Sequence, residues 1–351
     1  MSIWKQKSKL HIYTLFGILV SALYIIFPCN NTSAAQLERA STATLVEGAK
    51  KEGKLMWYTA GGVMEAELIL KKFKAKYPFI ETQYLRTNGE QLMIRIMTEH
   101  QTKKSRWDVA KVGGIKSLIL KQKGIFAKYI SPESSFINSD FKDPEGYWTS
   151  IYLGLLVTGY NTRLVSPNEV PKAWGDLLDP KWKGTIAMPT DSYEWFVYML
   201  KIMGEKKGLE YMKKLSEQNI TFRAGTTLNA QLVAAGETSI GIRLYPHRIE
   251  EMKKKGAPIE WLGYEPIIPL IHPLAVSEYA PHPYTARLFV DFLLSKEGQE
   301  IIASTYNIPT RVDVDPIIPR FKKGLKILPF DENLVNGYDK YLQVYRDMKF
   351  R

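Results

Sequence analysis

Two arginines stand where their side chains could bind an anion. Arg86 lies in "YLRTNG" and Arg243 in "GIRLYPH", and in both segments an apolar or strand-like run leads into a polar turn. A guanidinium offers forked hydrogen-bond donors that match a carboxylate, phosphate or phosphonate group. Either arginine could equally form a surface salt bridge. The sequence therefore leaves a shared anion pocket and two separate ion pairs as open alternatives.

Three tyrosines occupy similar positions at the ends of predicted strands. Tyr245 follows Arg243 by two positions, and Tyr58 and Tyr160 each close an apolar run. A phenol can supply a hydroxyl and an aromatic wall to a pocket, or a phenolate ligand to a hard metal ion. Packing at the edge of a cleft is the alternative for all three.

The remaining candidates come from four polar segments, 58–62, 86–89, 188–192 and 243–247, each of which joins a predicted strand to a predicted helix. In open α/β sheets, ligands bind beyond the carboxyl ends of the strands, where free helix N–H groups favour anions. Glycines in these segments permit a close approach to the backbone. The candidate ligand-binding residues are Tyr58, Thr59, Gly61, Gly62, Arg86, Thr87, Asn88, Gly114, Tyr160, Thr190, Ser192, Arg243 and Tyr245.

Common enzyme motifs are missing from the chain. It contains no GxxxxGK[ST], GxGxxG, GxSxG or HExxH segment. His247 and Glu250 are spaced as two helical metal ligands, but without a third ligand we interpret them as solvated side chains. His272 and His282 each precede a proline, which is typical of a turn or a strand end. We therefore expect neither catalysis nor a cofactor.

The predicted elements alternate between strand and helix, which indicates an α/β protein with mostly parallel sheets covered on both faces. "KLMWYT" (54–59) is the first strand, and helical periodicity predicts helices at 193–203, 207–218 and 226–235. A second unit begins near "YLGLLVTGYNT". More than one segment crosses between the units, so we expect two lobes with a hinged cleft. The expected boundaries are 36–150 with 266–310 for lobe 1, and 151–265 with 311–351 for lobe 2.

The first 35 residues have the pattern of a secretory signal peptide. Three lysines precede an apolar run at 10–27, and small residues follow it. An uncleaved membrane anchor is the alternative, because the run is borderline in length for a bilayer of about 30 Å. Cys29, the only cysteine, lies in this leader after Pro28, which disfavours lipid attachment. The exported chain would then hold its fold without disulfides.

The chain is strongly basic, with a formal net charge of +12 that falls to +9 without the leader lysines. Its lysine-rich stretches fit the polar faces and ends of predicted helices, so we interpret them as a solvated surface. No recognisable nucleic-acid-binding module is present, and we expect no nucleic-acid partner.

Several ordered phrases resemble the extracellular solute-binding proteins of ABC importers, in the branch that contains ferric-ion-binding periplasmic proteins. These phrases include "FKAKYPFIETQYLRTNGEQL", "WDVAKVGG", "VPKAWGDLLDPKWKG" and "HPYTARLFVDFLLSKEGQ", and the likeness covers about residues 45–315. The resemblance implies a two-lobed type II periplasmic-binding-protein fold, each lobe a mostly parallel sheet flanked by helices, with the ligand cleft between the lobes. It also implies a monomer without enzymatic activity, which docks on a membrane permease.

The resemblance does not extend to a ferric-ion site. Iron-binding relatives typically use a histidine, a glutamate and two adjacent tyrosines, and the corresponding positions here are Gly62, Gly113, Leu244 and Tyr245. One of these four ligands is retained. Nearby arginines also repel a bare trivalent cation.

We therefore expect an exported ABC-importer protein that captures a small anion, such as a carboxylate, phosphonate or other oxyanion. Ferric iron bound by Tyr58, Tyr160 and Tyr245 with an exogenous anion is the alternative cargo. An exported enzyme or a sensory receptor on the same scaffold are further alternatives. The location is periplasmic or otherwise extracytoplasmic, with tethering by an uncleaved leader as a variant.

Overall fold

The computed structural model describes residues 37–348, so the predicted signal peptide and Cys29 lie outside the described residues. Within that range, no helix combines the length and the hydrophobicity that a bilayer crossing requires. The strands are β1 (Lys54–Thr59), β2 (Glu81–Arg86), β3 (Val109–Lys111), β4 (Phe126–Ala127), β5 (Thr149–Asn161), β6 (Ile186–Pro189), β7 (Thr221–Arg223), β8 (Ile240–Leu244), β9 (Ile259–Leu262), β10 (Ile268–Ser277) and β11 (Ile308–Pro309). The α-helices are α2 (Thr42–Glu52), α3 (Val63–Lys76), α4 (Gly89–Gln101), α5 (Gly114–Gln122), α6 (Tyr193–Met203), α7 (Glu205–Ser216), α8 (Thr226–Ala235), α9 (Pro246–Lys254), α10 (Pro283–Leu294), α11 (Lys296–Ser304) and α12 (Tyr338–Asp347).

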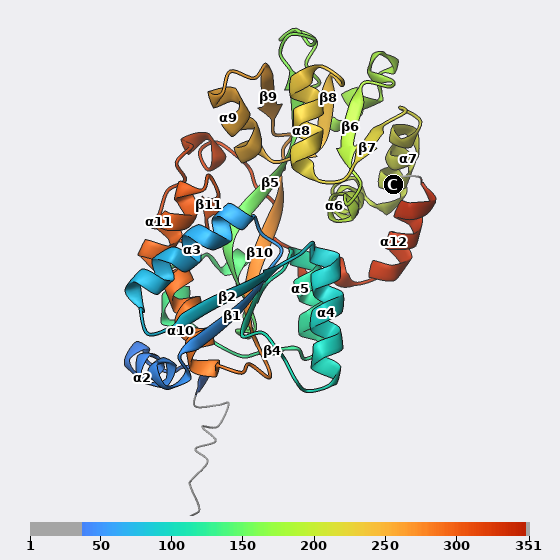
Figure 1. The fold of residues 1–351 in the computed structure, drawn as a ribbon. Helices are drawn as coiled ribbons and strands as arrows, with labels where there is room; N and C mark the ends of the chain where they lie inside the picture. Colours follow the sequence, from blue (N-terminus) through green and yellow to red (C-terminus); the bar gives the residue numbers. More distant parts are fainter. Residues whose placement is uncertain (1–36, 349–351) are drawn as a thin grey trace, which may run out of the picture. The chain divides into compact units, whose positions relative to one another are not determined.

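Parallel strands form the centre of each of two lobes. In lobe 1, β1 pairs in parallel with β2 and with β3, and in lobe 2, β6 pairs in parallel with β7 and with β8. Among the described residues, all strands belong to one connected sheet, whose main order is β2-β1-β3-β10-β5-β8-β6-β7. Off this order, β4 pairs with β10, and β9 and β11 pair with β5. Strands β5 and β10 are antiparallel to each other and join the two parallel portions (Figure 1). The expected parallel strands are therefore confirmed in both lobes.

Strand β5 belongs to both lobes. Its first part pairs with β10 and β11, and its last part, from Val157 to Asn161, pairs with β8 and β9. The expected lobe boundary, between residues 150 and 151, falls inside this strand. A continuous apolar run does not reveal that its two halves pair with different strands, because those partners are distant in sequence. The exact residue boundaries of the lobes remain a prediction.

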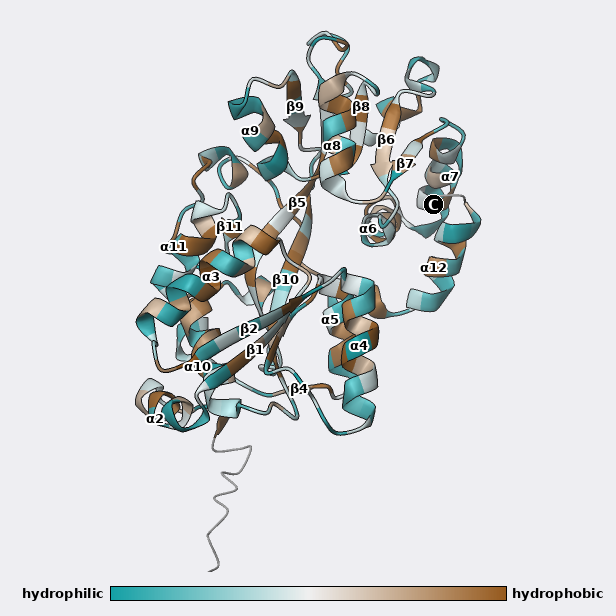
Figure 2. Ribbon diagram, viewed as in Figure 1, coloured by the Kyte–Doolittle hydropathy of each residue, from teal (hydrophilic) through white to brown (hydrophobic). Residues whose placement is uncertain are grey.

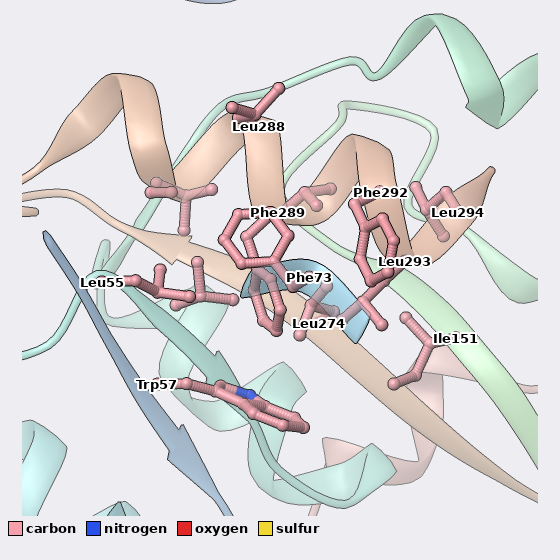
Figure 3. Close-up of a cluster of buried hydrophobic side chains, with 14 of the residues drawn as sticks. Leu55, Trp57, Phe73, Ile151, Leu274, Leu288, Phe289, Phe292, Leu293 and Leu294 are labelled. Carbon is pink, nitrogen blue, oxygen red and sulfur yellow. The ribbon is translucent and has the colours of Figure 1, made fainter. Parts of the chain in front are cut away.

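Lobe 1 has a hydrophobic core on each face of its sheet. Leu55 and Trp57 of β1 face the core formed with α2, α3 and α10, whereas Tyr58 faces the core formed with α4 and α5. This alternation follows from the two-residue period of a strand. Figure 3 shows Trp57 and Phe73 beside the aromatic residues of α10, where the Phe289 ring lies 5.2 Å from Trp57 and 5.0 Å from Phe73.

The periodicity of the helices agrees with the sequence-based expectations. The predicted helices at 193–203 and 226–235 coincide with α6 and α8, and α7 begins two residues before the expected position 207. In Figure 2, α3 and α4 carry hydrophobic and hydrophilic residues in alternating bands, as expected for helices with one face on a core. Asn88 caps α4 by accepting a hydrogen bond from the Gln91 amide.

Candidate ligand-binding site

The carboxyl ends of β1, β2 and β3 meet at one edge of lobe 1. Thr59 pairs with Arg86 on one side and with Lys111 on the other. The buried Thr59 hydroxyl accepts a hydrogen bond from the Gly61 amide at 3.0 Å, and Arg86 Nε donates to the Gly61 carbonyl at 3.2 Å. These contacts hold the loop that begins with Gly61. The Arg86 side chain is exposed, so its guanidinium lies at the rim of this edge.

Lys111 forms a buried polar network at this same edge. Its side chain is 1% exposed, forms an ion pair with Glu65 of α3, and donates to the Tyr152 hydroxyl at 2.8 Å. A Cβ atom on Gly61 would overlap with the Lys111 ammonium, so a larger residue there would displace the Lys111 side chain. The Tyr152 ring packs on His272 with centroids 4.1 Å apart. Lys111 therefore connects the lobe 1 edge to the joining strands β5 and β10.

The facing edge in lobe 2 contains a buried arginine. Arg243, the fourth residue of β8, is 5% exposed, and its Nη1 lies 3.3 Å from Asp191 Oδ1 and 3.2 Å from Thr226 Oγ1. Its Nε is buried and has no hydrogen-bond partner among the described residues. Its backbone has φ +59°, a left-handed conformation that non-glycine residues rarely adopt. A buried guanidinium with a free donor is costly unless a ligand satisfies it.

The loop before α6 is tied to the C-terminal helix by one tyrosine. The Tyr345 hydroxyl donates to the Thr190 carbonyl at 3.0 Å and accepts from the Ser192 amide at 3.1 Å. The Ser192 hydroxyl donates to the Pro189 carbonyl at 2.6 Å, so it bonds within the loop. Tyr345 therefore holds the loop that precedes the N-terminus of α6.

Replacing Tyr345 by phenylalanine removes both hydrogen bonds to this loop while it keeps the ring. We expect the free energy of unfolding, measured with urea, to fall by about 1–2 kcal/mol, because the buried Ser192 amide and the partly buried Thr190 carbonyl lose their partner. Tyr279→Phe is the control, since that ring is exposed, and a change within about 0.5 kcal/mol is expected there. Equal stability of the two variants would contradict this role of Tyr345.

Tyr245 directly follows β8 and precedes α9. Its ring stacks on His247 with centroids 5.4 Å apart, and the Arg243 guanidinium lies 5.8 Å from the ring centre. Burial raises the pKa of Tyr152, and the charges of Glu65 and Tyr245 add to this effect, which places Tyr245 near Tyr152. Burial, with the Arg248 charge adding to it, lowers the pKa of His247 to about 3. His247 is therefore a neutral ring at physiological pH.

A carboxyl group from lobe 2 reaches the N-terminus of α5 in lobe 1. Glu194 lies in the first turn of α6, and its Oε1 would be 3.0 Å from a Cβ atom on Gly114, the first residue of α5. This oxygen is buried and has no hydrogen-bond partner among residues 37–348. Burial raises the pKa of Glu194 to about 7, although the positive charges of Lys116 and Arg243 oppose the shift.

Most of the predicted residues gather at these two edges. Lobe 1 contributes Thr59, Gly61, Gly62, Arg86, Thr87, Asn88 and Gly114, and lobe 2 contributes Thr190, Ser192, Arg243 and Tyr245. Several of their side chains already bond within the protein. The Thr87 hydroxyl donates to Gln91, and the Asn88 side chain caps α4. These two side chains are therefore engaged by their own loop and helix.

The structure does not bring Tyr58 and Tyr160 to this place. Tyr58 is 2% exposed, and its hydroxyl donates to Glu99 and accepts from Arg95, inside the α4 face of lobe 1. Tyr160 pairs with Ile240, at the beginning of β8, whereas Tyr245 follows the end of that strand. At about 3.3 Å per residue, this separates Tyr160 from Tyr245 by roughly 10 Å or more. The three tyrosines therefore do not form one ligand set.

The histidines do not form a metal site either. Among the described residues, no three His, Cys, Asp or Glu side chains are placed to hold a metal ion. His247 and Glu250 were expected to be solvated, but His247 stacks on Tyr245, and Glu250 accepts a hydrogen bond from Trp261 Nε1 at 2.7 Å. His282 lies 3.0 Å from the buried Asp108, a contact within lobe 1. A surface hollow of about 550 Å³ is lined only by residues of the loop 168–182, so it does not draw on both lobes.

Comparison with known proteins identifies the family of the chain. Residues 119–332 match the model of the family described as bacterial extracellular solute-binding protein. The chain belongs to this family. Members of the family are solute-binding transport proteins, and this solute-binding protein has the two-lobed type II fold of periplasmic binding proteins.

Relatives with different cargoes share this fold. The solute-binding protein is 29% identical over 287 residues to an uncharacterised Haemophilus influenzae protein, covering 74% of this chain and 80% of that protein. AfuA from Actinobacillus pleuropneumoniae, solved with exogenous fructose-6-phosphate, is 26% identical with a TM-score of 0.75, covering 84% of this chain and 98% of AfuA. Iron-bound HitA from Pseudomonas aeruginosa is 21% identical with a TM-score of 0.77, covering 84% and 99% of the two chains. At 21% identity, the likeness to HitA shows a shared fold and does not indicate which ligand this chain binds.

Sequence reasoning did not find four of the polar groups at this place: Glu65, Lys111, Tyr152 and Glu194. Lys111 could have been found from the sequence, because it lies in the apolar run "WDVAKV" and a lysine in a buried strand is usually paired with an acidic residue. Glu65 and Tyr152 carry no comparable signal, since their partners are distant in sequence. Glu194 resembles an ordinary acidic residue in the first turn of a helix.

Proposed function

We propose that this solute-binding protein captures a small oxyanion between its lobes and delivers it to the membrane permease of an ABC importer. The observation that carries the proposal is Arg243, which is 5% exposed and whose Nε has no partner among the described residues. A buried guanidinium with a free Nε donor is matched best by a ligand with paired anionic oxygens. The protein acts as an exported monomer without catalysis, and its leader directs it out of the cytoplasm.

The ligand draws on both lobes in this proposal. Arg243 pairs with its charge, and the N-termini of α5 and α6 supply backbone N–H groups with favourable dipoles. Neither helix has a side-chain hydrogen bond that caps its N-terminus. Tyr245 and the neutral His247 supply ring faces beside the anion. A ligand that contacts both edges shifts the hinge equilibrium toward the closed state by its differential affinity.

A phosphate ester of a small polyol fits this arrangement best. Its phosphoryl oxygens match the guanidinium and the helix N-termini, and its carbon skeleton can lie against the rings of Tyr245 and His247. The likeness to AfuA, which was solved with fructose-6-phosphate, supports the same chemical class. Small carboxylates and phosphonates remain within the proposed range of ligands.

The proposal is tested by the temperature of unfolding with a panel of sugar phosphates, phosphonates, carboxylates and ferric citrate. A ligand at 100 times its dissociation constant should add about 2.7 kcal/mol to the free energy of unfolding. We expect stabilisation by at least one phosphate ester. Stabilisation by ferric citrate, with no response to any other anion, would overturn the proposal.

Ferric iron is the weaker candidate cargo. Tyr245 and Tyr152 lie near each other and could supply two phenolates, but burial raises the pKa of Tyr152 well above its ordinary value. The cations of Lys111 and Arg243 lie close by and oppose a bare trivalent ion. Phenolate-bound iron is coloured, so a purified protein that stays colourless with added ferric citrate would exclude this cargo.

A further inference from the structure

Glu194 has a buried carboxyl oxygen that no side chain among the described residues satisfies. Its carboxyl group projects from the first turn of α6 toward Gly114 at the start of α5, and Oε1 is buried without a hydrogen-bond partner among the described residues. Each oxygen of a carboxylate can accept two hydrogen bonds. A buried carboxylate oxygen without a hydrogen-bond donor is unfavourable. A ligand that carries a hydroxyl group can supply this donor.

Charged and titratable groups of α5, β8, the loop before α6 and α6 itself act on Glu194, whereas β10 and the segment at Phe330 bring apolar side chains to the same place. Lys116 lies on α5, Arg243 on β8, Asp191 in the loop before α6, and Tyr193 and Tyr198 on α6 itself. The two cations favour ionisation of the carboxyl group, whereas burial and Asp191 oppose it. Burial dominates, and the pKa of Glu194 is raised to about 7. At neutral pH, the group can therefore either donate or accept a proton.

We propose that Glu194 determines ligand specificity by sharing one proton with the oxyanion that Arg243 binds. The proposal rests on the proposed function, because it concerns the same anion. An ionised Glu194 repels an oxyanion unless a hydroxyl hydrogen lies between them. The favoured ligands therefore carry a hydroxyl on, or directly beside, their charged centre, as protonated phosphates and hydroxylated phosphate esters do. Oxyanions without such a hydroxyl bind only after Glu194 takes up a proton.

Inorganic phosphate and sulfate separate these two cases. Near pH 8 phosphate retains one hydroxyl, whereas sulfate has none. Sulfate then binds only to the form of the protein in which Glu194 is protonated. Near pH 8, about one unit above the Glu194 pKa of about 7, this form is about a tenth of the total, so the apparent affinity for sulfate is about tenfold weaker. Calorimetric titration of the mature chain should show phosphate bound at least about tenfold more tightly than sulfate near pH 8. Sulfate affinity should rise about tenfold between pH 8 and pH 6.

The variant Glu194→Gln separates this role from simple anion binding. Its amide keeps an acceptor and adds a donor, so sulfate affinity should rise, lose its pH dependence, and approach that of phosphate. Glu210→Gln, at an exposed position of α7, is the matched control and should behave like the wild type. Circular dichroism and the unfolding temperature show whether each variant is folded.

The outcomes distinguish this inference from the proposed function. If the wild type binds phosphate and sulfate equally near pH 8, or if Glu194→Gln keeps the discrimination and its pH dependence, the role of Glu194 is wrong and the anion site stands. If the wild type binds neither these ions nor any anion of the wider panel, both proposals fail. A destabilised Glu194→Gln is replaced by Glu194→Met, which should bind sulfate without pH dependence.

Discussion

Replacing Arg243 by glutamine should weaken anion binding by about 10- to 100-fold. A hydrogen bond to a charged group contributes about 1.5–3 kcal/mol, and each 1.4 kcal/mol corresponds to a factor of ten in affinity. The variant removes a buried cation whose Nε has no partner among the described residues. Asp191, which loses an ion pair, has a side chain that is 70% exposed and stays solvated. The effect should therefore appear in binding more than in folding.

Calorimetric titration with the strongest ligand of the panel measures this effect. Arg243→Lys should be intermediate, because it keeps the charge and loses the fork. Arg163→Gln, at an exposed position, is the control and should bind like the wild type. Position 243 has a left-handed backbone conformation, which is unfavourable for any residue other than glycine. Arginine, glutamine and lysine all bear this conformational cost, so it does not distinguish the variants from the wild type. Unchanged affinity in a folded Arg243→Gln variant would contradict the anion site.

Replacing Lys111 by methionine should lower the free energy of unfolding by about 3 kcal/mol or more. Removing one partner of a buried ion pair leaves an uncompensated charge, which costs about 3–5 kcal/mol. Lys111 is 1% exposed, and its partner Glu65 is 11% exposed. Methionine has a similar volume, so the loss comes from the charge and from the hydrogen bond to Tyr152. Urea unfolding of the mature chain measures the change.

The double variant Lys111→Met with Glu65→Gln tests whether the loss of stability comes from the unpaired Glu65 carboxylate. Because the uncompensated carboxylate is also removed, the double variant should be more stable than Lys111→Met alone. Lys74→Met, at an exposed position of α3, is the control, and its effect should stay within about 0.5 kcal/mol. A single variant as stable as the wild type would show that the network does not stabilise the fold.

Local patterns in the chain were enough to predict many of its elements. The run 54–59 coincides with β1, and the helical periodicity at 193–203 and 226–235 coincides with α6 and α8. These predictions succeeded because period, caps and breakers are properties of neighbouring residues. The double pairing of β5 could not be predicted in this way, because hydrogen bonding between strands depends on distant segments.

The candidate site shows the same limit at the level of single side chains. Tyr58 is a predicted ligand-facing residue because it lies near the end of β1. A shift of one residue along a strand moves the side chain to the opposite face of the sheet, because successive side chains alternate between the faces. Tyr58 points into the core between the sheet and α4, whereas the next residue, Thr59, holds the Gly61 loop. Position near a strand end correctly indicates the edge of the lobe, but it does not indicate the face of the sheet to which a side chain points.

The sequence by itself determined the family, the two-lobed α/β class and the segments that form the edges of the lobes. It also indicated Arg243 and Tyr245 as neighbours at one strand end. Only the tertiary structure revealed that Arg243 is buried with a free donor, that Lys111 pairs with Glu65, and that Glu194 of one lobe reaches Gly114 of the other. Burial and charge pairing depend on residues that are far apart in the chain, so no local pattern encodes them. The physical character of the site is therefore a property of the packed lobes.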